Sequence, residues 1–354
     1  MYWRKATTAG DVSQPCKTEW GTGSKRGYRS AKRSNGDFGI EQIDRPLPDA
    51  LMSSTSCVEI RDQTGAMAQV LPELGGWLVR YQKPVPGHGL VQALHHDEAV
   101  IARYPREMWA GSPLLFPLVS YNHVSGADHH YTWAGQNHPM QPHGFARKTP
   151  WKVTAQAADQ VEITLTDTEA TRTVYPFAFR YSLTYRLQNG RLHWEQLIEN
   201  HSSDPMPYCV GFHPYLPIPL SPGSKRSDCI IRVPRATRFN PVGRGEAYFS
   251  EPFPEQEFPA TVDTGPALLL GDLQTREVAL VDRAARLEVV INWQEAPAYR
   301  FCGLWSRTPS ENFYCLEPWT SLPNAFSRPD DGEIQILGPG QSFRAAMWMD
   351  VRSC

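Results

Sequence analysis

The chain has 354 residues, enough to form one large domain or two ordinary ones around a substantial core. Its 35 lysine and arginine residues nearly balance 37 aspartate and glutamate residues, so no strong overall field attracts the chain to nucleic acid or to an anionic membrane. No apolar run approaches the roughly 18 residues of a membrane-spanning helix, and the N-terminus lacks the apolar stretch of a secretory signal. We therefore expect a cytoplasmic protein with neither a nucleic-acid nor a membrane partner.

Residues 1 to about 50 differ in composition from the rest of the chain. Basic residues stand there among glycine, serine and threonine, with few aliphatic side chains: Lys25, Arg26, Arg29, Lys32 and Arg33. Such a segment buries too little apolar surface to offset the entropy lost on ordering it, so we expect a disordered extension. Two alternatives are an organelle transit peptide, against which Asp11 and Glu19 argue, and a translation start at Met52.

From Cys57 onward, alternating patterns predict strands separated by turns. In residues 181–187 apolar or aromatic side chains recur at every second position, residues 192–198 repeat the pattern except at Gln196, and the turn signal Asn189-Gly190 lies between the two segments. Further strands are predicted at Gln160 to Asp167, Glu277 to Asp282, Arg286 to Trp293 and Phe343 to Val351. No long helical period is present, and 31 prolines and 26 glycines punctuate the chain. We therefore expect residues 51–354 to form a single all-β domain, a large antiparallel β-sandwich.

Three short segments each place one titratable side chain among glycine, proline and aromatic residues. They are His143-Gly144-Phe145-Ala146-Arg147, Gly211-Phe212-His213-Pro214-Tyr215 and Cys315-Leu316-Glu317-Pro318-Trp319. Histidine titrates near neutral pH, and burial among apolar residues raises the pKa of a glutamate toward the same range. Taken alone, each residue also has a structural interpretation: a loop histidine for His143, a core histidine for His213, and a capping or paired carboxylate for Glu317. Their joint occurrence points to acid/base chemistry on a small molecule.

The cysteines and the paired histidines do not have the spacing of a metal site. The seven cysteines are scattered and never spaced C-x-x-C: Cys16, Cys57, Cys209, Cys229, Cys302, Cys315 and Cys354. The adjacent pairs His95-His96 and His129-His130 would point to opposite faces of a strand. We expect reduced thiols, no metal and no cofactor.

In their order and spacing, the three segments resemble the galactose mutarotase-like superfamily and, within it, the aldose 1-epimerases. The resemblance runs from about Cys57 to Val351. It also rests on Ser112-Pro113-Leu114-Leu115-Phe116-Pro117, Asn200 through Pro207, Leu322-Pro323-Asn324-Ala325 and Leu337-Gly338-Pro339-Gly340. It implies a large β-sandwich that binds a small sugar on its concave sheet, and an isomerase that interconverts the α and β anomers of a free aldohexose.

The same resemblance implies a role for each residue of the site. His213 matches the acid that protonates the ring oxygen, Glu317 the base that takes the anomeric proton, and His143 a second histidine that steadies developing charge. Sugar contacts are expected from four further residues: Arg147, Asn122, Tyr215 and Trp319. Asn122 is included because Ser120-Tyr121-Asn122 stands where the family often carries a Gly-Arg pair. The aspartate that some members place on the sugar falls in the stretch of Asp263 and Asp272.

Two alternative functions remain open at this stage. A hexose-6-phosphate 1-epimerase would need a cationic pocket, for which Arg80, Arg147 and Arg328 are candidates. A carbohydrate-binding β-sandwich without catalysis is the other alternative, because fold does not determine function. Retention of His143, His213 and Glu317 together argues against the second.

Overall fold

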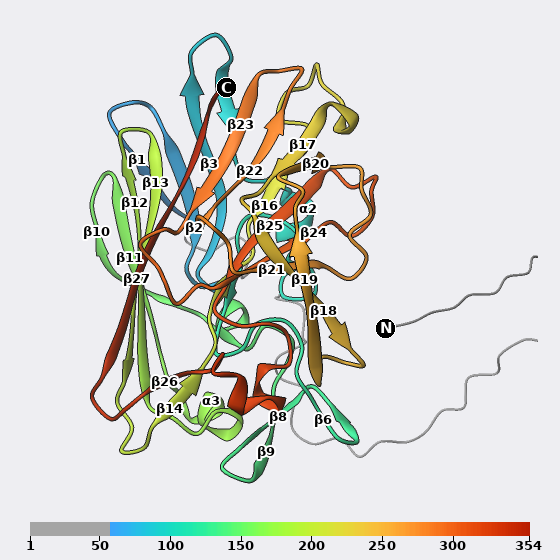
Figure 1. Cartoon of the computed structure of the whole chain (residues 1–354). Coiled ribbons are helices and arrows are strands. Elements are labelled where there is room, and N and C mark those ends of the chain that lie inside the picture. The colour runs from blue at the N-terminus through green and yellow to red at the C-terminus, as the bar shows by residue number, and fades with distance from the viewer. Residues whose placement is uncertain (1–56) are drawn as a thin grey trace, which may run out of the picture. The chain divides into compact units, whose positions relative to one another are not determined.

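The hairpin predicted around Asn189-Gly190 forms the centre of a large antiparallel sheet. The computed structural model describes residues 57–354 (Figure 1). In it, β12 (Phe179–Gln188) and β13 (Arg191–Asn200) pair along ten residues. Asn189 and Gly190 both have positive φ angles, 52° and 80°, as a tight two-residue hairpin turn requires. The predicted alternation of this hairpin is confirmed, since its apolar positions are buried.

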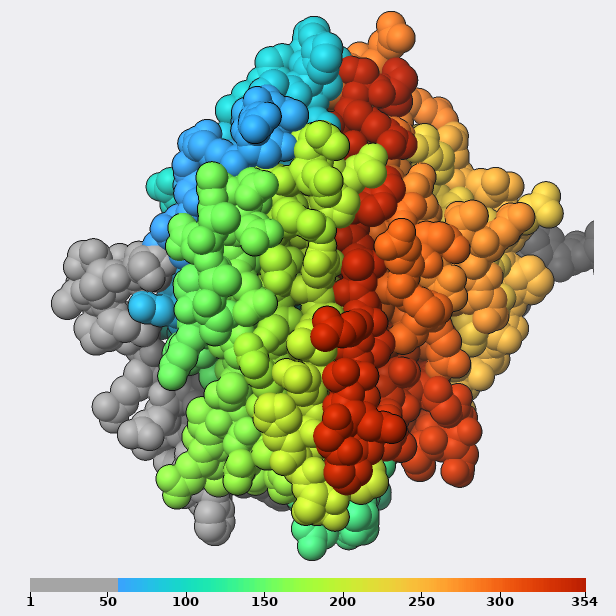
Figure 2. Space-filling view, turned by 90° about the vertical axis from the view of Figure 1, so that its left-hand side faces the viewer, coloured from blue at the N-terminus to red at the C-terminus, as the bar shows by residue number. Residues whose placement is uncertain are grey.

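This hairpin belongs to a nine-stranded sheet whose middle strand is the C-terminal strand β27. Figure 2 shows the outer face of this sheet, with β27 in red between the green and yellow strands on one side and the orange strands on the other. The four further strands predicted from the sequence are all present, as β11, β22, β23 and β27. In sheet order the strands are β10 (Lys152–Gln156), β11 (Gln160–Thr166), β12, β13, β27 (Ser342–Ser353), β23 (Leu287–Asn292), β22 (Glu277–Asp282), β17 (Cys229–Arg232) and β20 (Glu257–Pro259).

A second, eight-stranded sheet packs against the first and carries all three titratable segments on or beside its strands. Its main path is β19 (Ala247–Phe253), β18 (Ala236–Val242), β21 (Leu268–Gly271), β24 (Phe301–Trp305), β25 (Phe313–Trp319), β15 (Gly211–Phe212) and β5 (Leu114–Leu115), and β16 (Tyr215–Pro217) also pairs with β25.

Smaller elements complete the described part of the chain. A four-stranded sheet contains β1 (Val58–Arg61), β2 (Met67–Leu71), β3 (Trp77–Val85) and β4 (Gly89–Gln92). Three strand pairs are β6 (His123–Val124) with β7 (Ala127–Asp128), β8 (His130–Trp133) with β9 (Gln136–Pro139), and β14 (Met206–Tyr208) with β26 (Gln335–Leu337). The helices are the short α2 (Glu98–Ile101) and α3 (Glu169–Val174) and the 3-10 turns Ala146–Lys148, Arg226–Asp228, Ala325–Ser327 and Pro329–Asp331.

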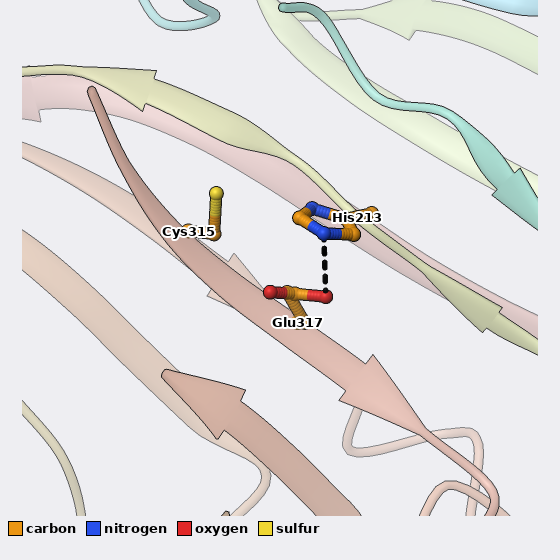
Figure 3. A group of neighbouring side chains, drawn as sticks. All are labelled: His213, Cys315 and Glu317. Atoms are coloured by element: carbon orange, nitrogen blue, oxygen red, sulfur yellow. Dashed lines mark ion pairs between the residues drawn. The ribbon is translucent and has the colours of Figure 1, made fainter. Parts of the chain in front are cut away.

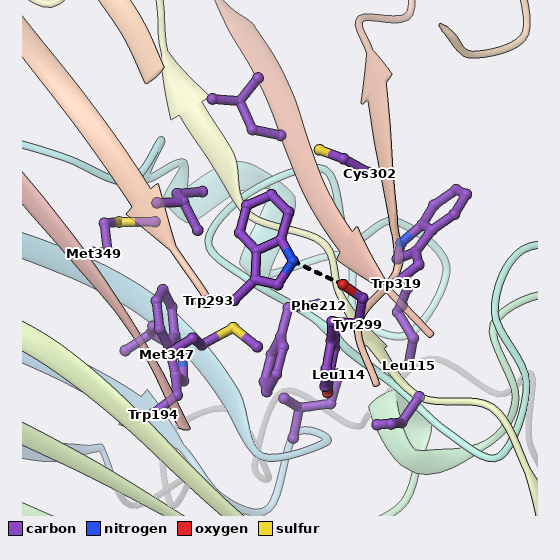
Figure 4. Close-up of a cluster of buried hydrophobic side chains, with 14 of the residues drawn as sticks. Leu114, Leu115, Trp194, Phe212, Trp293, Tyr299, Cys302, Trp319, Met347 and Met349 are labelled. Carbon is purple, nitrogen blue, oxygen red and sulfur yellow. Dashed lines mark hydrogen bonds between the residues drawn. The ribbon is translucent and has the colours of Figure 1, made fainter. Parts of the chain in front are cut away.

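The core lies between the two large sheets and is rich in aromatic side chains (Figure 4). Trp194 of β13 packs on Phe212 of β15, with ring centroids 5.8 Å apart. A buried polar chain also lies in the core: Tyr181 donates to Gln196, and Gln196 donates to the Tyr299 hydroxyl at 2.6 Å. Because these buried polar groups have partners, the free-energy cost of burying them is largely offset. The expected antiparallel β-sandwich is confirmed.

The predictions for the N-terminal residues are not tested by the structure, whereas the one for membrane-spanning helices is tested for residues 57–354. The predicted disordered extension over residues 1–50 and the alternative start at Met52 lie outside the described residues. Within residues 57–354, no helix has the length and apolar character needed to cross a membrane.

Trp194 tests whether the intersheet core is the main source of stability. We expect Trp194→Ala to lose about 3–5 kcal/mol of unfolding free energy, because it opens a cavity in a fully buried cluster. The matched control is Trp348→Ala, which removes the same side chain from the opposite face of the neighbouring β27, where the ring is only partly buried and stacks on Arg191. Urea denaturation measures both losses. Equal losses would contradict the assignment of the core.

Candidate active site

Glu317 and Cys315 occupy one face of strand β25. Side chains alternate along a strand, so Phe313, Cys315, Glu317 and Trp319 share a face that is opposite to Tyr314 and Leu316. Gly211 of β15 pairs with Trp319, and Tyr215 of β16 pairs with Cys315. Midway between these two pairs, the antiparallel register sets His213 across from Glu317. Phe212 points to the intersheet core, so its neighbour His213 points away from it.

His213 and Glu317 form the centre of the site (Figure 3). The Nε2 atom of His213 lies 3.3 Å from Oε2 of Glu317, and both residues are buried. Tyr215 stacks on the imidazole of His213 with ring centroids 4.6 Å apart, and Trp305 packs edge-on against the same ring. These aromatic contacts hold the imidazole in one orientation. Beyond the 3.3 Å contact, neither Oε2 of Glu317 nor Nδ1 of His213 has a hydrogen-bond partner within the described residues, so both buried atoms have unused hydrogen-bonding capacity.

His143 approaches the pair from a loop in a strained backbone conformation. Its φ angle is 66° and that of Gly144 is 72°. Gly144 lies against the chain at Phe116, where an added Cβ would stand 2.2 Å from the carbonyl oxygen, so only glycine fits. The His143 ring lies 5.4 Å from the ring of His213, measured between centroids.

Hydrogen bonds with Ser120 set the tautomer of His143. The backbone N–H of Ser120 donates to Nδ1 of His143 at 3.0 Å, and the backbone N–H of His143 donates to the carbonyl oxygen of Ser120 at 2.7 Å. Because Nδ1 accepts, the proton of the neutral ring sits on Nε2. His143 therefore presents an N–H donor, not an acceptor, at Nε2.

The indole of Trp319 covers two glycines on the strands that flank β25. An added Cβ on Gly303 of β24 would stand 2.9 Å from Cη2 of this indole, and one on Gly211 of β15 would stand 2.6 Å from its Cδ1. The ring centroid of His143 lies 6.4 Å from that of Trp319. The two glycines thus make room for a large flat side chain beside the histidines.

Burial changes the protonation of both central residues in opposite directions. Burial raises the pKa of Glu317 well above its usual range, and its neighbour Trp319 offsets only part of this. Burial and the positive charge of Arg147 lower the pKa of His213 to about 3. The pair therefore holds one proton between its two groups through the neutral range. Burial, with Arg147 and His213 adding to it, also lowers the pKa of His143, which keeps that ring neutral.

A known protein family matches most of the chain. The sequence model of the aldose 1-epimerase family matches residues 56–349. The chain belongs to the aldose 1-epimerase family. The plasmid-encoded protein LacX of Lactococcus lactis subsp. lactis is 25% identical over an alignment of 247 residues, which covers 64% of this chain and 79% of LacX.

Solved structures share the fold of this chain. Slr1438 from Synechocystis sp. PCC 6803 superimposes with a TM-score of 0.71 at 23% identity, over 91% of this chain and 100% of that protein. A galactose mutarotase-like protein from Clostridium acetobutylicum superimposes with a TM-score of 0.72 at 19% identity, over 84% of this chain and 95% of that protein. The predicted resemblance is confirmed for the family and for the fold.

Arg147 is the arginine whose charge acts on both histidines of the candidate site. It lowers the pKa values of His143 and His213, which places its charge beside both. Its Nη2 donates to the carbonyl oxygen of Pro142 at 2.9 Å, whereas its buried Nε has no hydrogen-bond partner among the described residues. Residues 57–354 supply no ion pair to this guanidinium in the described contacts. Arg147 therefore retains donor capacity for a ligand.

Arg328 and Arg80 do not join Arg147 in the described contacts. Arg328 pairs with Glu333 and Asp331, donates to three backbone carbonyl oxygens through Nη1, and lies over the ring of Tyr248. Its donors are committed to holding the loop around Asn324. Arg80 lies on β3 of the four-stranded sheet. The described contacts thus join neither Arg80 nor Arg328 to Arg147.

The remaining residues predicted to contact the sugar differ in burial and in their contacts with the pair. Asn122 is buried, and its Oδ1 has no hydrogen-bond partner within residues 57–354, but the described contacts do not join its side chain to His213 or Glu317. One face of the Tyr215 ring is covered by His213. Asp263 is exposed, where it caps the backbone of Gly265, and Asp272 is exposed as well. The roles of Asn122, Arg147, Tyr215 and Trp319 stay predictions.

Cys315 was not anticipated as a member of the site. One ligand atom each from His213, Cys315 and Glu317 lies within 4.8 Å of the other two. The signal was available, because Cys315 stands two residues before Glu317 in a strand and so must share its face. The adjacent histidine pairs, by contrast, serve other contacts: His95 packs on Phe313, and Nδ1 of His96 bonds the carbonyl oxygen of Val79.

The raised pKa of Glu317 predicts a pH-dependent gain in stability for Glu317→Gln. Above the ordinary glutamate pKa the unfolded chain loses this proton while the folded chain keeps it, so the wild type loses stability as pH rises toward the raised pKa. Glutamine does not titrate. Between about pH 5 and pH 8 we expect the unfolding free energy of the variant, measured by urea denaturation, to rise relative to that of the wild type. The rise should be at most about 1.4 kcal/mol per pH unit.

Glu288→Gln is the matched control because the pKa of Glu288 is shifted in the opposite direction from that of Glu317. Burial of Glu288 is outweighed by its contacts with Arg352 and Arg232, and the net effect lowers its pKa. Its stabilising contribution is therefore present at neutral pH and is lost in acid as pH falls through the lowered pKa. A stability difference for Glu317→Gln that does not change with pH would contradict the raised pKa of Glu317.

Proposed function

We propose that this chain is an aldose 1-epimerase that interconverts the α and β anomers of a free aldohexose. The observation that carries the proposal is the contact between His213 and Glu317 at 3.3 Å, with the Nε2–H of His143 alongside. Both oxygens that exchange protons in the reaction are bonded to C1 of the sugar. An acid and a base that must reach them together have to be about this close.

The proposed reaction needs one proton to be given and one to be taken. Glu317 removes the proton from the anomeric hydroxyl, His213 protonates the ring oxygen, the C1–O5 bond breaks, and an aldehyde forms at C1. Rotation about the C1–C2 bond presents the other face of the aldehyde, and closure returns each proton to its source. No atom is lost and no cofactor is consumed. General acid and base contributions of about 10²–10⁴-fold suit a reaction that already proceeds in water.

The protonation of the pair is compatible with these roles. The pKa directions favour a proton on Glu317 and a neutral His213 in the free protein. The reactive form, with the proton on His213, contains the same number of protons and is reached by one transfer across the 3.3 Å contact. Sugar hydroxyls that donate to Glu317 would favour its ionised form, because hydrogen bonds to a carboxylate stabilise the charge.

His143 is proposed to bind a sugar oxygen. Its Nδ1 is engaged by the backbone of Ser120, so the Nε2–H can donate to an oxygen on which negative charge develops. Arg147 is proposed to donate to a hydroxyl from the same side, and Trp319 to offer an aromatic edge to the sugar ring. A location in the cytoplasm is proposed as well, on the grounds that the six cysteines within the described residues are free thiols.

Anomer exchange measured by NMR tests the proposed function. We expect the protein to accelerate exchange for at least one of glucose and galactose, and Glu317→Gln and His213→Asn each to lower kcat/KM by about 10²–10⁴-fold. The matched controls are Glu288→Gln and His193→Asn, which change a buried carboxylate and a part-buried imidazole on the nine-stranded sheet. Both controls should exchange sugars at the wild-type rate.

Two outcomes would contradict the proposal. Absence of acceleration for every sugar would exclude the epimerase, and wild-type rates in Glu317→Gln would exclude the catalytic pair. The 6-phosphates of both sugars belong in the same experiment. Faster anomer exchange of the 6-phosphates alone would mean that the substrate is a phosphorylated aldose. Arg328 would not be expected to bind that phosphate, because it is already paired with Glu333 and Asp331.

A further inference from the structure

We propose that His213, Cys315 and Glu317 bind one zinc ion, and that this ion inhibits the protein by occupying the acid and the base. The inhibitory half rests on the proposed function, whereas the binding half does not. The three side chains lie together in Figure 3.

The distances fit a tetrahedral metal site with a small adjustment. Zinc bonds of about 2.0–2.3 Å place neighbouring tetrahedral ligand atoms about 3.3–3.8 Å apart. Nε2 of His213 and Oε2 of Glu317 are already 3.3 Å apart. One ring nitrogen of His213, Sγ of Cys315 and one carboxylate oxygen of Glu317 all lie within 4.8 Å of one another, so each pair of ligand atoms has to approach by about 1.5 Å at most.

The chemistry of the ligands selects zinc over the common hard cations. Thiolate, imidazole and carboxylate are the ligands that zinc takes in proteins, whereas Mg²⁺ and Ca²⁺ prefer oxygen ligands only. A thiolate and a carboxylate together carry two negative charges, which cancel the charge of Zn²⁺. The thiol proton and the proton held by the pair leave to solvent. A neutral complex is the form that a buried site tolerates, even beside Arg147.

The site has unused ligand capacity. Oε2 of Glu317 has no hydrogen-bond partner within the described chain, and this residue is only 2% exposed. His213 is 7% exposed, and its aromatic neighbours Tyr215 and Trp305 hold the ring in place. Nδ1 of His213 also has no partner in residues 57–354, so the second-shell contact that strengthens resident zinc sites is missing. This favours a reversible inhibitor over a permanent cofactor.

The position of the ion explains why it would inhibit. Zinc on Nε2 of His213 and Oε2 of Glu317 removes the lone pairs that give and take protons in the proposed reaction. Three protein ligands leave one tetrahedral position, and the ion would occupy the space that the hemiacetal oxygens need. Sugar and zinc are therefore expected to compete for the same site.

Cobalt spectroscopy tests the binding half without reference to activity. Co²⁺ is added to the full-length protein in the presence of a phosphine, which keeps the cysteine thiols reduced. Bound Co²⁺ is detected by its thiolate-to-cobalt charge-transfer band and by the visible bands of tetrahedral cobalt. We expect both at one equivalent, their loss on adding Zn²⁺, and their absence in Cys315→Ala. Cys302→Ala is the matched control, because Cys302 is an equally buried thiol on the adjacent β24, where it faces the core. It should keep both sets of bands.

Anomer exchange then tests the inhibitory half. We expect Zn²⁺ to inhibit the wild type and Cys302→Ala alike, and Cys315→Ala to need at least about 10-fold more Zn²⁺ for the same inhibition. Cys315→Ser keeps the volume of the side chain nearly unchanged and replaces Cys315→Ala in both experiments if the alanine variant does not fold. No charge-transfer band in the wild type, or a band that survives in Cys315→Ala, would overturn the site. Cobalt bands without any sugar exchange would instead overturn the proposed function and leave the site standing.

Discussion

The register of β25 against β15 and β16 is the constraint on which the rest of the site depends. Gly211 pairs with Trp319 and Tyr215 with Cys315, and these two pairs set His213 opposite Glu317. A slip of one residue would turn one of the two side chains to the intersheet core, because side chains alternate along a strand. The two segments therefore share a spacing of two for a structural reason: His213 and Tyr215 of one segment lie on the same side as Cys315 and Glu317 of the other.

The environment of His213 and Glu317 contains several features that destabilise the fold. A carboxyl group that is 2% exposed and has an unpartnered oxygen costs free energy of folding, and the positive φ angle at His143 adds strain. The aromatic core between the sheets offsets these costs, with Trp194, Phe212 and the Gln196–Tyr299 hydrogen bond at its centre. The same burial that destabilises the site brings the two pKa values to the state in which one proton is shared.

Sequence patterns predicted the parts of the structure that depend on local chemistry. The β12–β13 hairpin follows from alternation and Asn189-Gly190, and the choice of His143, His213 and Glu317 as neighbours in one site follows from their segments and the family resemblance. The order of strands does not follow, because the placement of β27 in the middle of its sheet depends on pairing between distant segments. Arg328 was considered for a phosphate because its charge is visible in the sequence, whereas its ion pair with Glu333 is visible only in the fold.

The direct measurement of whether His213 and Glu317 act as one unit is a double-mutant cycle on kcat/KM for anomer exchange. The cycle compares the wild type, His213→Asn, Glu317→Gln and the double variant at one neutral pH. If the two groups share one proton across the 3.3 Å contact, either single change removes the function of both, and the double variant should be within about 10-fold of the slower single variant. Losses that multiply would show that the two residues act independently and would contradict the shared-proton pair.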